Sequence, residues 1–369
     1  RLAIQAAVRE NRIERFLNPG DQCAVNESGA EAVYDVEGID EEEPATPYMT
    51  HELSLVRNLV RENMQFDPPQ YLFYVDPADY PSGLPAGTYN ITLSHGQYGG
   101  GTDQDSTYQF TTTAAVPAGG GIRHTTMGCY QSSYNKSQIT GGKFVCYQAD
   151  GLTTVSGNDS LATTEGSGGT NLGTTTARDP QYKSGASVNF TERNYYGSNR
   201  WSTSWIRQYL NSDEAIMTFR KGTVFSRPST ASIEGFMHKL DADLKAVLGK
   251  VRKRYALSIA DGYGYEDIED TVTLCTMLDI FGSQNNSIPE GPVDDTNTVT
   301  RTVAKSLWRI FLTTNADRIK TLNSSARVWW LSSTHPGGAD SERHVKASGA
   351  LNYDVAYNSF GVVPVLHII

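Results

Sequence analysis

The sequence predicts an α+β protein with a β-rich N-terminal region and a second part in which helices join the strands. The first observation is composition: of 369 residues, 38% are apolar and 20% are charged, below the ~45–50% and ~25% of ordinary globular domains. The second is the content of 34 glycines and 20 tyrosines, which is typical of loop-rich and strand-rich proteins that display surface. The third is the period of the apolar residues, which is two along residues 71–113 and three to four beyond about residue 200. The length suits two or three domains.

The chain opens with an amphipathic pattern that predicts a helix over residues 2–17, ended by Asn-Pro-Gly-Asp at residues 18–21. The apolar side chains on one side of this helix are Leu2, Ile4, Val8, Ile13, Phe16 and Leu17. A free helix of this length cannot shield such a face. We therefore expect it to be buried against another subunit or against the chain's own β-layer, and we expect the N-terminal region to carry the assembly contacts.

Six short strand patterns follow, separated by polar residues. They lie at residues 23–25, 32–36, 53–56, 71–75, 88–93 and 107–111. The last two alternate strictly and predict a hairpin whose tip is the Gly-rich segment 96–105. The acidic stretch 40–44 predicts a solvated turn.

The Pro/Gly-rich segment 116–121 is the clearest domain boundary in the sequence. We predict an N-terminal helix and β-rich assembly region over residues 1–118 and a second domain over 119–369. Residues 66–118 would be a β insert. The alternative for the strands of residues 20–56 is that they belong to the sheet of the second domain.

The second domain is expected to begin with a long polar loop at residues 148–188 and to continue with helices. Steps of three and four between apolar residues predict helices at 202–210, 236–248 and 299–311. Two short apolar strands, 329–333 and 362–369, follow and should share one sheet. The helix at 202–210 should pack against that sheet through Trp205, Ile206 and Leu210.

Charge and cysteine content exclude several classes of protein. The net charge is −10, and the one basic cluster, at residues 250–254, is bracketed by aspartates, so a nucleic-acid partner is not expected. Four cysteines, Cys23, Cys129, Cys146 and Cys275, are too few and too scattered for a disulfide scaffold or a zinc site. Cys129 and Cys146 could pair across a hairpin, but free thiols in a reducing cytoplasm are favoured. There is no apolar run of ~18 residues that predicts a membrane span, and no signal peptide is expected.

Catalytic and metal-binding signatures are missing from the sequence. It contains no GxSxG elbow, P-loop or GxGxxG. The His-Glu pair at residues 51–52 begins like a zinc-protease helix, but Leu55 stands in the place of the second His. His335 and His344 have no carboxylate pair at ligand spacing, so loop histidines are favoured over a metal site. The acidic segment 261–270 lacks EF-hand spacing, so a solvated turn is favoured over a calcium loop. We expect no enzyme, no metal and no cofactor.

Two segments carry a family resemblance. The first is the run 196–213, which opens Tyr-Gly-Ser-Asn-Arg-Trp-Ser, and the second combines Trp-Trp-Leu at 329–331 with residues 348–352 and 361–364. In this order they resemble a family of bacteriophage and prophage virion proteins. The C-terminal domain of that family is similar to the C-type-lectin-like fold, which formylglycine-generating enzymes also use. The resemblance covers most of residues 19–369.

Some members of this family look like the variable proteins of diversity-generating retroelements, in which a fixed scaffold presents a changeable binding face. The resemblance implies that residues 119–369 form the C-type-lectin-like domain, with a display region at 329–369. Its frame would be residues 329–331, 348–351 and 361–364. The receptor-binding positions that it implies are Thr334, His335, Asp340, Ser341, Glu342, His344, Lys346, Tyr353, Asp354, Tyr357, Asn358 and Phe360.

We expect these side chains to form one contiguous, solvent-facing patch far from the N-terminal helix. Tyr, Asp, Asn, Ser and His are adaptable side chains that are favoured in paratopes, and Tyr353 and Tyr357 would be the anchors. The alternative is that the two tyrosines cover the core. The adjacent Trp329 and Trp330 should face opposite sides of their strand.

The resemblance implies a phage virion surface protein that binds a host-cell receptor, which would be a bacterial surface protein or glycan. Its other partners would be virion structural proteins and copies of itself in a homo-oligomer, without nucleic acid and without membrane insertion. It would be located in the virion, assembled in the bacterial cytoplasm. The alternative is a purely structural virion component, such as a head decoration, fibre or tail-tip subunit that binds no receptor.

Two other functions of the same fold are disfavoured. A formylglycine-generating enzyme needs a redox-active cysteine pair in the C-terminal half of the fold, and residues 276–369 contain no cysteine. A calcium-dependent lectin is disfavoured because the triplets Glu-Pro-Asn, Gln-Pro-Asp and Trp-Asn-Asp do not occur.

Overall fold

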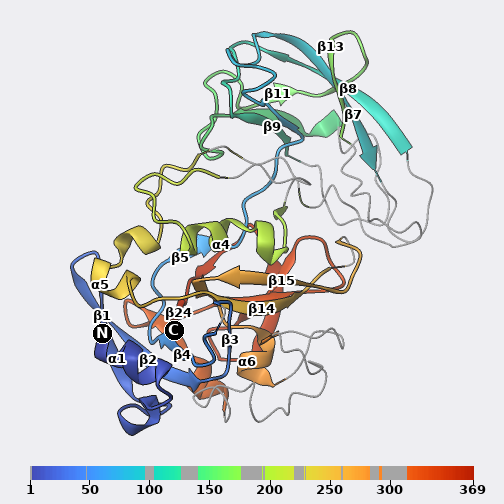
Figure 1. Cartoon of the computed structure of the whole chain (residues 1–369). Coiled ribbons are helices and arrows are strands. Elements are labelled where there is room, and N and C mark those ends of the chain that lie inside the picture. The colour runs from blue at the N-terminus through green and yellow to red at the C-terminus, as the bar shows by residue number, and fades with distance from the viewer. Residues whose placement is uncertain are drawn as a thin grey trace.

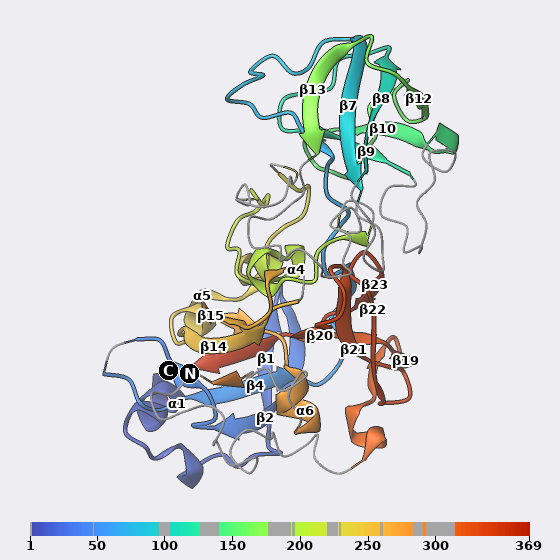
Figure 2. The ribbon, with the colours of Figure 1, turned by 90° about the vertical axis from the view of Figure 1, so that its right-hand side faces the viewer.

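The fold is that of a computed structural model, which describes residues 2–46, 48–95, 104–125, 140–175, 193, 196–219, 228, 230–258, 261–282, 291–292 and 314–369. Over these residues the protein is β-rich, with few short helices and several open, mostly antiparallel sheets. Figures 1 and 2 show two parts. We call the described residues of 71–175 the lobe and the other described residues the body.

The central sheet of the body joins the first strands of the chain to the last. Its order is β1-β2-β4-β24-β16, and all neighbouring strands are antiparallel. The strands are β1 (Gln22–Glu27), β2 (Ala30–Ile39), β4 (Leu53–Arg57), β24 (Val365–Ile368) and β16 (Val272–Thr273). The opening strands therefore share a sheet with the C-terminal part, which is the alternative considered for residues 20–56.

A second five-stranded sheet carries the predicted display region. Its order is β22-β21-β20-β23-β5, in which β20 and β23 are parallel. The strands are β22 (Leu351–Val355), β21 (Ser341–Val345), β20 (Trp329–Thr334), β23 (Ser359–Gly361) and β5 (Asn63–Gln65).

The expectation that strands 329–333 and 362–369 share one sheet is wrong. Gly361 pairs with Trp329 in the second sheet, and the chain then crosses to the central sheet, where Val365 pairs with Val56. The two sheets nevertheless share their cores. Trp329 lies in a cluster with Val365, and Trp330 lies in the larger cluster that contains Leu366 and the helix α4 (Trp205–Leu210), so the two tryptophans face opposite sides as predicted.

A third sheet is built around β14 (Val251–Ala256), which pairs with β15 (Tyr265–Asp270), β17 (Gly291–Pro292) and β3 (Glu43–Pro44). The acidic stretch 40–44 is therefore not a solvated turn, because it provides β3 and buries Glu42. A small hairpin, β18 (Lys320–Leu322) and β19 (Ser325–Arg327), completes the strands of the body.

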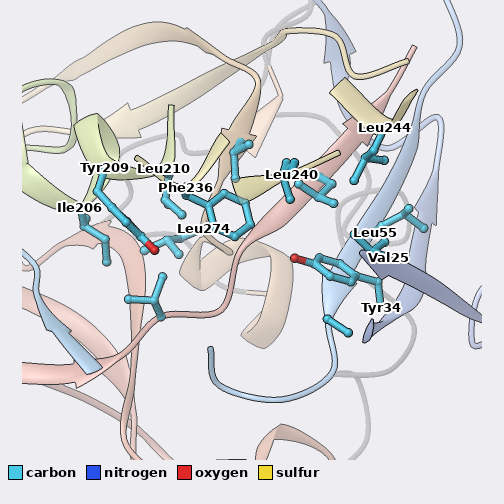
Figure 3. Close-up of a cluster of buried hydrophobic side chains, with 14 of the residues drawn as sticks. Val25, Tyr34, Leu55, Ile206, Tyr209, Leu210, Phe236, Leu240, Leu244 and Leu274 are labelled. Carbon is cyan, nitrogen blue, oxygen red and sulfur yellow. The ribbon is translucent and has the colours of Figure 1, made fainter. Parts of the chain in front are cut away.

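The helix α4 (Trp205–Leu210) begins at Ser204, whose side chain accepts a hydrogen bond from the Arg207 backbone N–H. The apolar side chains of α4 are buried in the same cluster as Trp330 and Leu366, which confirms that Trp205, Ile206 and Leu210 pack into the core between the two sheets. Figure 3 shows this cluster reaching from α4 to the strands of the central sheet.

The helix predicted over 236–248 is interrupted. A 3₁₀ turn at Met237–Lys239 is followed by α5 (Ala242–Lys245), whose first turn is capped by the Asp241 side chain. Asp241 is extended rather than helical, because a capping residue adopts non-helical dihedrals. The helix predicted at 299–311 lies outside the described residues.

The N-terminal helix α1 (Leu2–Arg9) is shorter than predicted, because Asn11 has a positive φ of 51° that ends it. Leu2 and Phe16 are 73% and 63% exposed, so the predicted apolar face is only partly buried. Val8 and Ile13 enter the chain's own core. The Gln5 side chain donates a hydrogen bond to the Ile369 carbonyl at 2.9 Å, which places the helix beside the C-terminal strand. The assembly role of this region stays a prediction.

The lobe consists of two four-stranded sheets, β11-β10-β9-β6 and β12-β8-β7-β13. Its strands are β6 (Phe73–Tyr74), β7 (Gly87–His95), β8 (Gln104–Thr112), β9 (Gly121–His124), β10 (Lys143–Tyr147), β11 (Leu161–Ala162), β12 (Thr164–Glu165) and β13 (Thr170–Thr175). The predicted hairpin is β7–β8. Because β9 pairs with β6 and β10, the break at 116–121 lies inside the lobe and not between two domains. The stretch 148–188, expected to be loop, contributes three of these strands.

Cys23, Cys146 and Cys275 are free thiols, and Cys129 lies outside the described residues. Among the helices of the described segments, none has the length and apolarity needed to cross a membrane.

Candidate binding face

The strands β20, β21 and β22 bring the predicted receptor-binding residues together. In the antiparallel register, Thr334 lies opposite Glu342, Glu342 lies opposite Asp354, and Arg343 lies opposite Tyr353. Figure 2 shows these strands on the opposite side of the body from α1. The predicted separation from the N-terminal helix is therefore found.

The expectation that all these side chains face solvent is wrong. Thr334, Asp340, Glu342 and His344 are buried. Successive side chains of a strand point to opposite faces of its sheet. Glu342 and His344 therefore share the inward face, whereas Ser341 and Arg343 lie on the other face, which is half-buried at these two residues and fully buried at Val345. The His344 ring meets the Phe360 ring edge-on at 5.0 Å between centroids, and this is a core contact.

The outward side of the sheet carries a compact group of side chains. Tyr353 is 46% exposed. The His335 ring stacks on it with 3.9 Å between centroids, and the Arg343 guanidinium carbon lies 5.6 Å from its ring centroid. We call His335, Arg343 and Tyr353 the Tyr353 cluster. Lys346 is exposed nearby in sequence.

The remaining predicted residues, Ser341, Asp354, Tyr357, Asn358 and Phe360, are half-buried. The Tyr357 ring stacks on Tyr196 at 5.6 Å, and the Phe360 ring packs on Trp330 at 4.6 Å. Tyr357 therefore covers another tyrosine, and Phe360 belongs to the core side of the sheet.

Arg343 was missed by the sequence reasoning. It lies between Glu342 and His344 on β21 and directly opposite Tyr353. The signal that could have found it is the period of two in a strand: if Ser341 faces outward, so does Arg343.

The loop that carries His335 is fixed by residues from the segment 193–200. The Asn199 amide donates to the backbone carbonyls of His335, Gly338 and Ser341 at 3.3, 3.1 and 2.8 Å. Arg193 Nε donates to the Ala339 carbonyl at 2.7 Å. Because both donors are buried, they hold the loop rigidly under the Tyr353 cluster.

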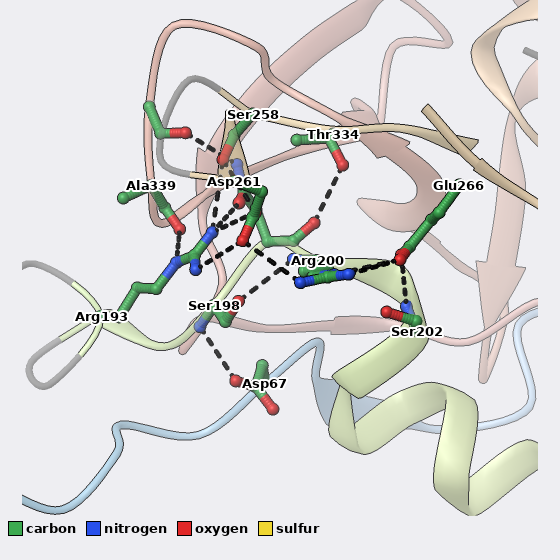
Figure 4. Close-up of polar contacts among 12 residues, drawn as sticks. Asp67, Arg193, Ser198, Arg200, Ser202, Ser258, Asp261, Glu266, Thr334 and Ala339 are labelled. Atoms are coloured by element: carbon green, nitrogen blue, oxygen red, sulfur yellow. Dashed lines mark hydrogen bonds and ion pairs between the residues drawn. The ribbon is translucent and has the colours of Figure 1, made fainter. Parts of the chain in front are cut away.

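Arg193 also joins this loop to the segment 261–270 (Figure 4). Its Nη2 lies 2.5 Å from Asp261 Oδ2, and its Nη1 donates to Asp261 Oδ1 at 3.0 Å. Burial alone would raise the pKa of Asp261, but the positive charges of Arg193 and Arg200 lower it below its ordinary value. Asp261 is therefore a buried carboxylate matched by arginine.

The other acidic side chains of this segment pair with arginines as well. Arg200 Nη2 lies 2.8 Å from Glu266 Oε2, and Arg207 Nη2 lies 2.8 Å from Asp270 Oδ1. Residues 265–270 form the strand β15, and residues 262–264 before it form a turn in which Tyr263 and Gly264 are exposed. The expected solvated turn is therefore found only in these few residues, and the carboxylates of the strand pair with guanidinium groups. Over the described residues, no group of three or more His, Cys, Asp or Glu side chains could hold a metal ion.

The histidines of the face are neutral at neutral pH. Burial lowers the pKa of His335 and of His344 to about 4. His335 packs outward against Tyr353 and His344 packs inward against Phe360, so the two do not converge on one ligand. The positive charge of Arg343 also lowers the pKa of His335, and that of Lys346 lowers the pKa of His344.

Comparison with known proteins identifies a family for this chain. No curated protein and no solved structure matches the chain. A family model described as "Domain of unknown function (DUF6273)" matches residues 182–369, which is just over half of the chain and includes the whole face. The chain belongs to this DUF6273 family.

Proposed function

We propose that the protein is a surface protein of a bacteriophage or prophage virion and that it binds a host-cell receptor, a bacterial surface protein or glycan. The body would be C-type-lectin-like, and the receptor would contact the outward side of β21 and β22. The single observation that carries the proposal is the Tyr353 cluster: an exposed aromatic ring on which an imidazole stacks and which has a guanidinium carbon 5.6 Å from its centroid.

Such a cluster has the properties of a binding anchor. A tyrosine offers a large amphipathic contact surface and loses little side-chain entropy on binding. This loss is smaller still when neighbouring groups already fix the orientation of the ring before binding. Tyr and Arg are also the residues that most often dominate binding energy at interfaces. Lys346 and Asp354 at the edge would set partner choice more than affinity.

The alternative, a purely structural virion component, is supported by the burial of Thr334, Asp340, Glu342 and His344. These side chains serve the fold and are not available for display. Under this alternative, the Tyr353 cluster would contact a neighbouring subunit of the particle and no receptor.

The test is attachment of the labelled full chain to a panel of bacterial strains. Tyr353→Ala and Arg343→Ala should each weaken attachment, Tyr353→Ala by about 30-fold if the ring contributes ~2 kcal/mol. For Tyr353→Ala, stability should change by about 0.5 kcal/mol or less, because the position is exposed. The matched control is Tyr48→Ala, since Tyr48 is 100% exposed and lies outside the second sheet.

The two functions give different results. Loss of attachment with normal assembly supports receptor binding. Normal attachment of Tyr353→Ala together with reduced incorporation into particles would support the structural alternative. Equal losses for Tyr353→Ala and Tyr48→Ala would show that the Tyr353 cluster is not a specific site.

A further inference from the structure

Three ionisable side chains meet inside the body, away from the binding face. Lys253 projects from β14, Asp279 from α6 (Met277–Phe281) and Glu42 from the residue before β3. Lys253 Nζ lies 2.8 Å from Asp279 Oδ2 and 2.5 Å from Glu42 Oε1. All three side chains are buried, and Val251 and Tyr255, which flank Lys253 on its face of β14, are buried too. Water is therefore excluded from the group.

The charges of this group do not balance, because one ammonium faces two carboxyl groups. Burial raises the pKa of Glu42 to about 7, although the positive charge of Lys253 opposes this. Among the described residues, Glu42 Oε2 has no hydrogen-bond partner. Glu42 is therefore a carboxyl group that can take up and release a proton at neutral pH, next to an amine.

Asp279 is held differently from Glu42. Its Oδ2 accepts a hydrogen bond from the Thr276 backbone N–H at 2.6 Å as well as the one from Lys253. Donors on a carboxyl oxygen withdraw electrons from the carbon and stabilise the negative charge that develops there when a nucleophile adds. The carbon most open to attack by Lys253 is thus Cγ of Asp279, and Glu42 is the neighbouring proton carrier.

We propose that Lys253 and Asp279 become joined by an intramolecular amide bond, which the folded protein forms on itself with Glu42 as the proton carrier. The site is a self-modification site that is separate from the binding face and independent of the proposed function. The cross-link would tie β14 to α6 across 26 residues of sequence.

The reaction is a condensation that needs no other reagent. The Lys253 ammonium gives a proton to Glu42, and the lone pair of the amine then forms the Nζ–Cγ bond with Asp279. Nζ loses a second proton, and one oxygen of Asp279 leaves with both protons as water. Glu42 passes on the proton that it took and returns to its starting state, so atoms and charge balance.

The proton transfer to Glu42 is the demanding step. Burial alone would lower the pKa of Lys253, but Asp279 and Glu42 raise it above its ordinary value, so the amine is mostly protonated. The product removes this cost: a neutral amide replaces a buried ion pair, whose desolvation is expensive. The amide N–H can still donate to Glu42, and its carbonyl can still accept from Thr276.

The experiment is the intact mass of the purified full chain, measured after denaturation. We expect a mass lower by one water molecule than the sequence gives, and a proteolytic fragment in which Lys253 is linked to Asp279. A chain with the full sequence mass, or a linkage that joins Lys253 to Glu42, would overturn the proposal.

Three single substitutions test the role of each residue in the cross-link. Lys253→Met and Asp279→Ala should restore the full mass, and Glu42→Gln should restore it although both joined residues remain. Because Glu42→Gln is nearly isosteric, it keeps the test valid if the other two variants do not fold. Loss of water that persists in Lys253→Met would place the reaction elsewhere and would refute the assignment.

The matched control is Lys245, whose Nζ lies 2.8 Å from Asp213 Oδ1. This distance equals that between Lys253 and Asp279, but the pair is partly exposed. Lys245→Met should leave the water loss unchanged. If it abolished the loss, simple proximity and not the buried group would be responsible.

Discussion

The lobe and the body stabilise their interiors by different means. The lobe has an apolar and aromatic core, in which the rings of Phe110 and Phe144 stack at 4.3 Å. The body buries ion pairs and carboxyl groups, among them Arg193–Asp261 and the group around Lys253. Among the described residues of the lobe, Arg123 is the buried charged side chain, and it lies over the rings of Tyr71 and Tyr147.

This difference shows which parts of the structure can be predicted from the local sequence and which cannot. An apolar core follows from the apolar pattern of each strand, so each strand can be assigned by itself. A charged core needs partners for every charge, and these partners come from distant parts of the chain. The body should therefore respond to pH and to loss of single charges, and the lobe should respond to packing alone.

The tryptophans allow the two parts to be measured separately. The lobe contains no tryptophan, whereas Trp201, Trp205, Trp329 and Trp330 are buried in the body. The fifth tryptophan, Trp308, lies outside the described residues. Tryptophan fluorescence during urea unfolding, measured in a Trp308→Phe background, therefore reports on the body. Hydrogen exchange of peptides from β9 and β10 reports on the lobe.

The largest effect is expected from Arg193→Met. Removing the arginine leaves Asp261 buried without its main partner, and breaking a buried ion pair in this way costs about 3–5 kcal/mol. The loop of His335 also loses the hydrogen bond to Ala339. The urea concentration at the midpoint of unfolding, measured by tryptophan fluorescence, should therefore be clearly lower than in the wild-type protein.

The control for this prediction is Arg252→Met. Arg252 Nη2 lies 2.9 Å from Glu269 Oε1, but both side chains are exposed, and such pairs contribute about 1 kcal/mol or less. If Arg193→Met and Arg252→Met lowered the urea midpoint equally, a buried ion pair would contribute no more to the stability of the body than an exposed one, which would contradict the prediction.

The same comparison explains how much of the fold the sequence could predict. The β7–β8 hairpin was predicted from alternation alone, because its partners are adjacent in sequence and its core side is apolar. In the body, Asp261 and its partner Arg193 are 68 residues apart, and Glu42 and Lys253 are 211 apart. Both acidic segments were read as solvated because local sequence does not show a distant cation.

The candidate site was predicted in part for a related reason. The resemblance singled out residues that the structure brings together on neighbouring strands, and of these Tyr353 and Lys346 are exposed. Their role in receptor binding stays a prediction. The resemblance did not show which way each side chain points, so Glu342 and His344 were assigned to the surface and Arg343 was passed over. If the pairing register of β21 and one outward-facing residue on it had been known, alternation along the strand would have assigned its other side chains to the two faces of the sheet.

The second prediction concerns pH and rests on Glu52 and His367. Both are buried, and Glu52 Oε1 lies 2.7 Å from His367 Nδ1. Burial raises the pKa of Glu52 from 4.5 to about 8 and lowers that of His367 from 6.5 to about 4. Glu52 therefore holds a proton in the folded body that the unfolded chain has released, and a rise in pH from 4.5 to 8 destabilises the body.

The histidines change the stability of the body with pH in the opposite direction to Glu52, and they do so over a different pH range. His335, His344 and His367, each with a pKa lowered to about 4, are neutral in the folded body between pH 4 and 6.5 while the unfolded chain is protonated, so rising pH stabilises the body there. Above pH 6.5 only the carboxyl groups contribute, Glu52 up to pH 8 and Glu42, whose pKa is about 7, over the lower part of this range. The body should then lose about 2–3 kcal/mol of stability between pH 6.5 and 8, of which about 2 kcal/mol comes from Glu52.

Glu52→Gln tests this assignment, because the amide keeps the shape but does not titrate. The variant should show a much smaller fall in the tryptophan urea midpoint between pH 6.5 and 8 than the wild-type protein. If the urea midpoint of Glu52→Gln fell between pH 6.5 and 8 as much as that of the wild-type protein, other groups would be responsible for the pH dependence.

The smallest effect is expected from a matched pair of packing changes, Ile122→Val in the lobe and Ile206→Val in the body. Both isoleucines are fully buried, and loss of one methylene in such a site costs about 0.5–1.5 kcal/mol. The core cluster of Ile122 shares no residue with that of Ile206. Ile122→Val should therefore speed hydrogen exchange in β9 and β10 and leave the tryptophan midpoint unchanged, and Ile206→Val should do the reverse. If each change moved both readouts, the lobe and the body would unfold as one unit, and the contrast between their cores would concern composition only and not stability.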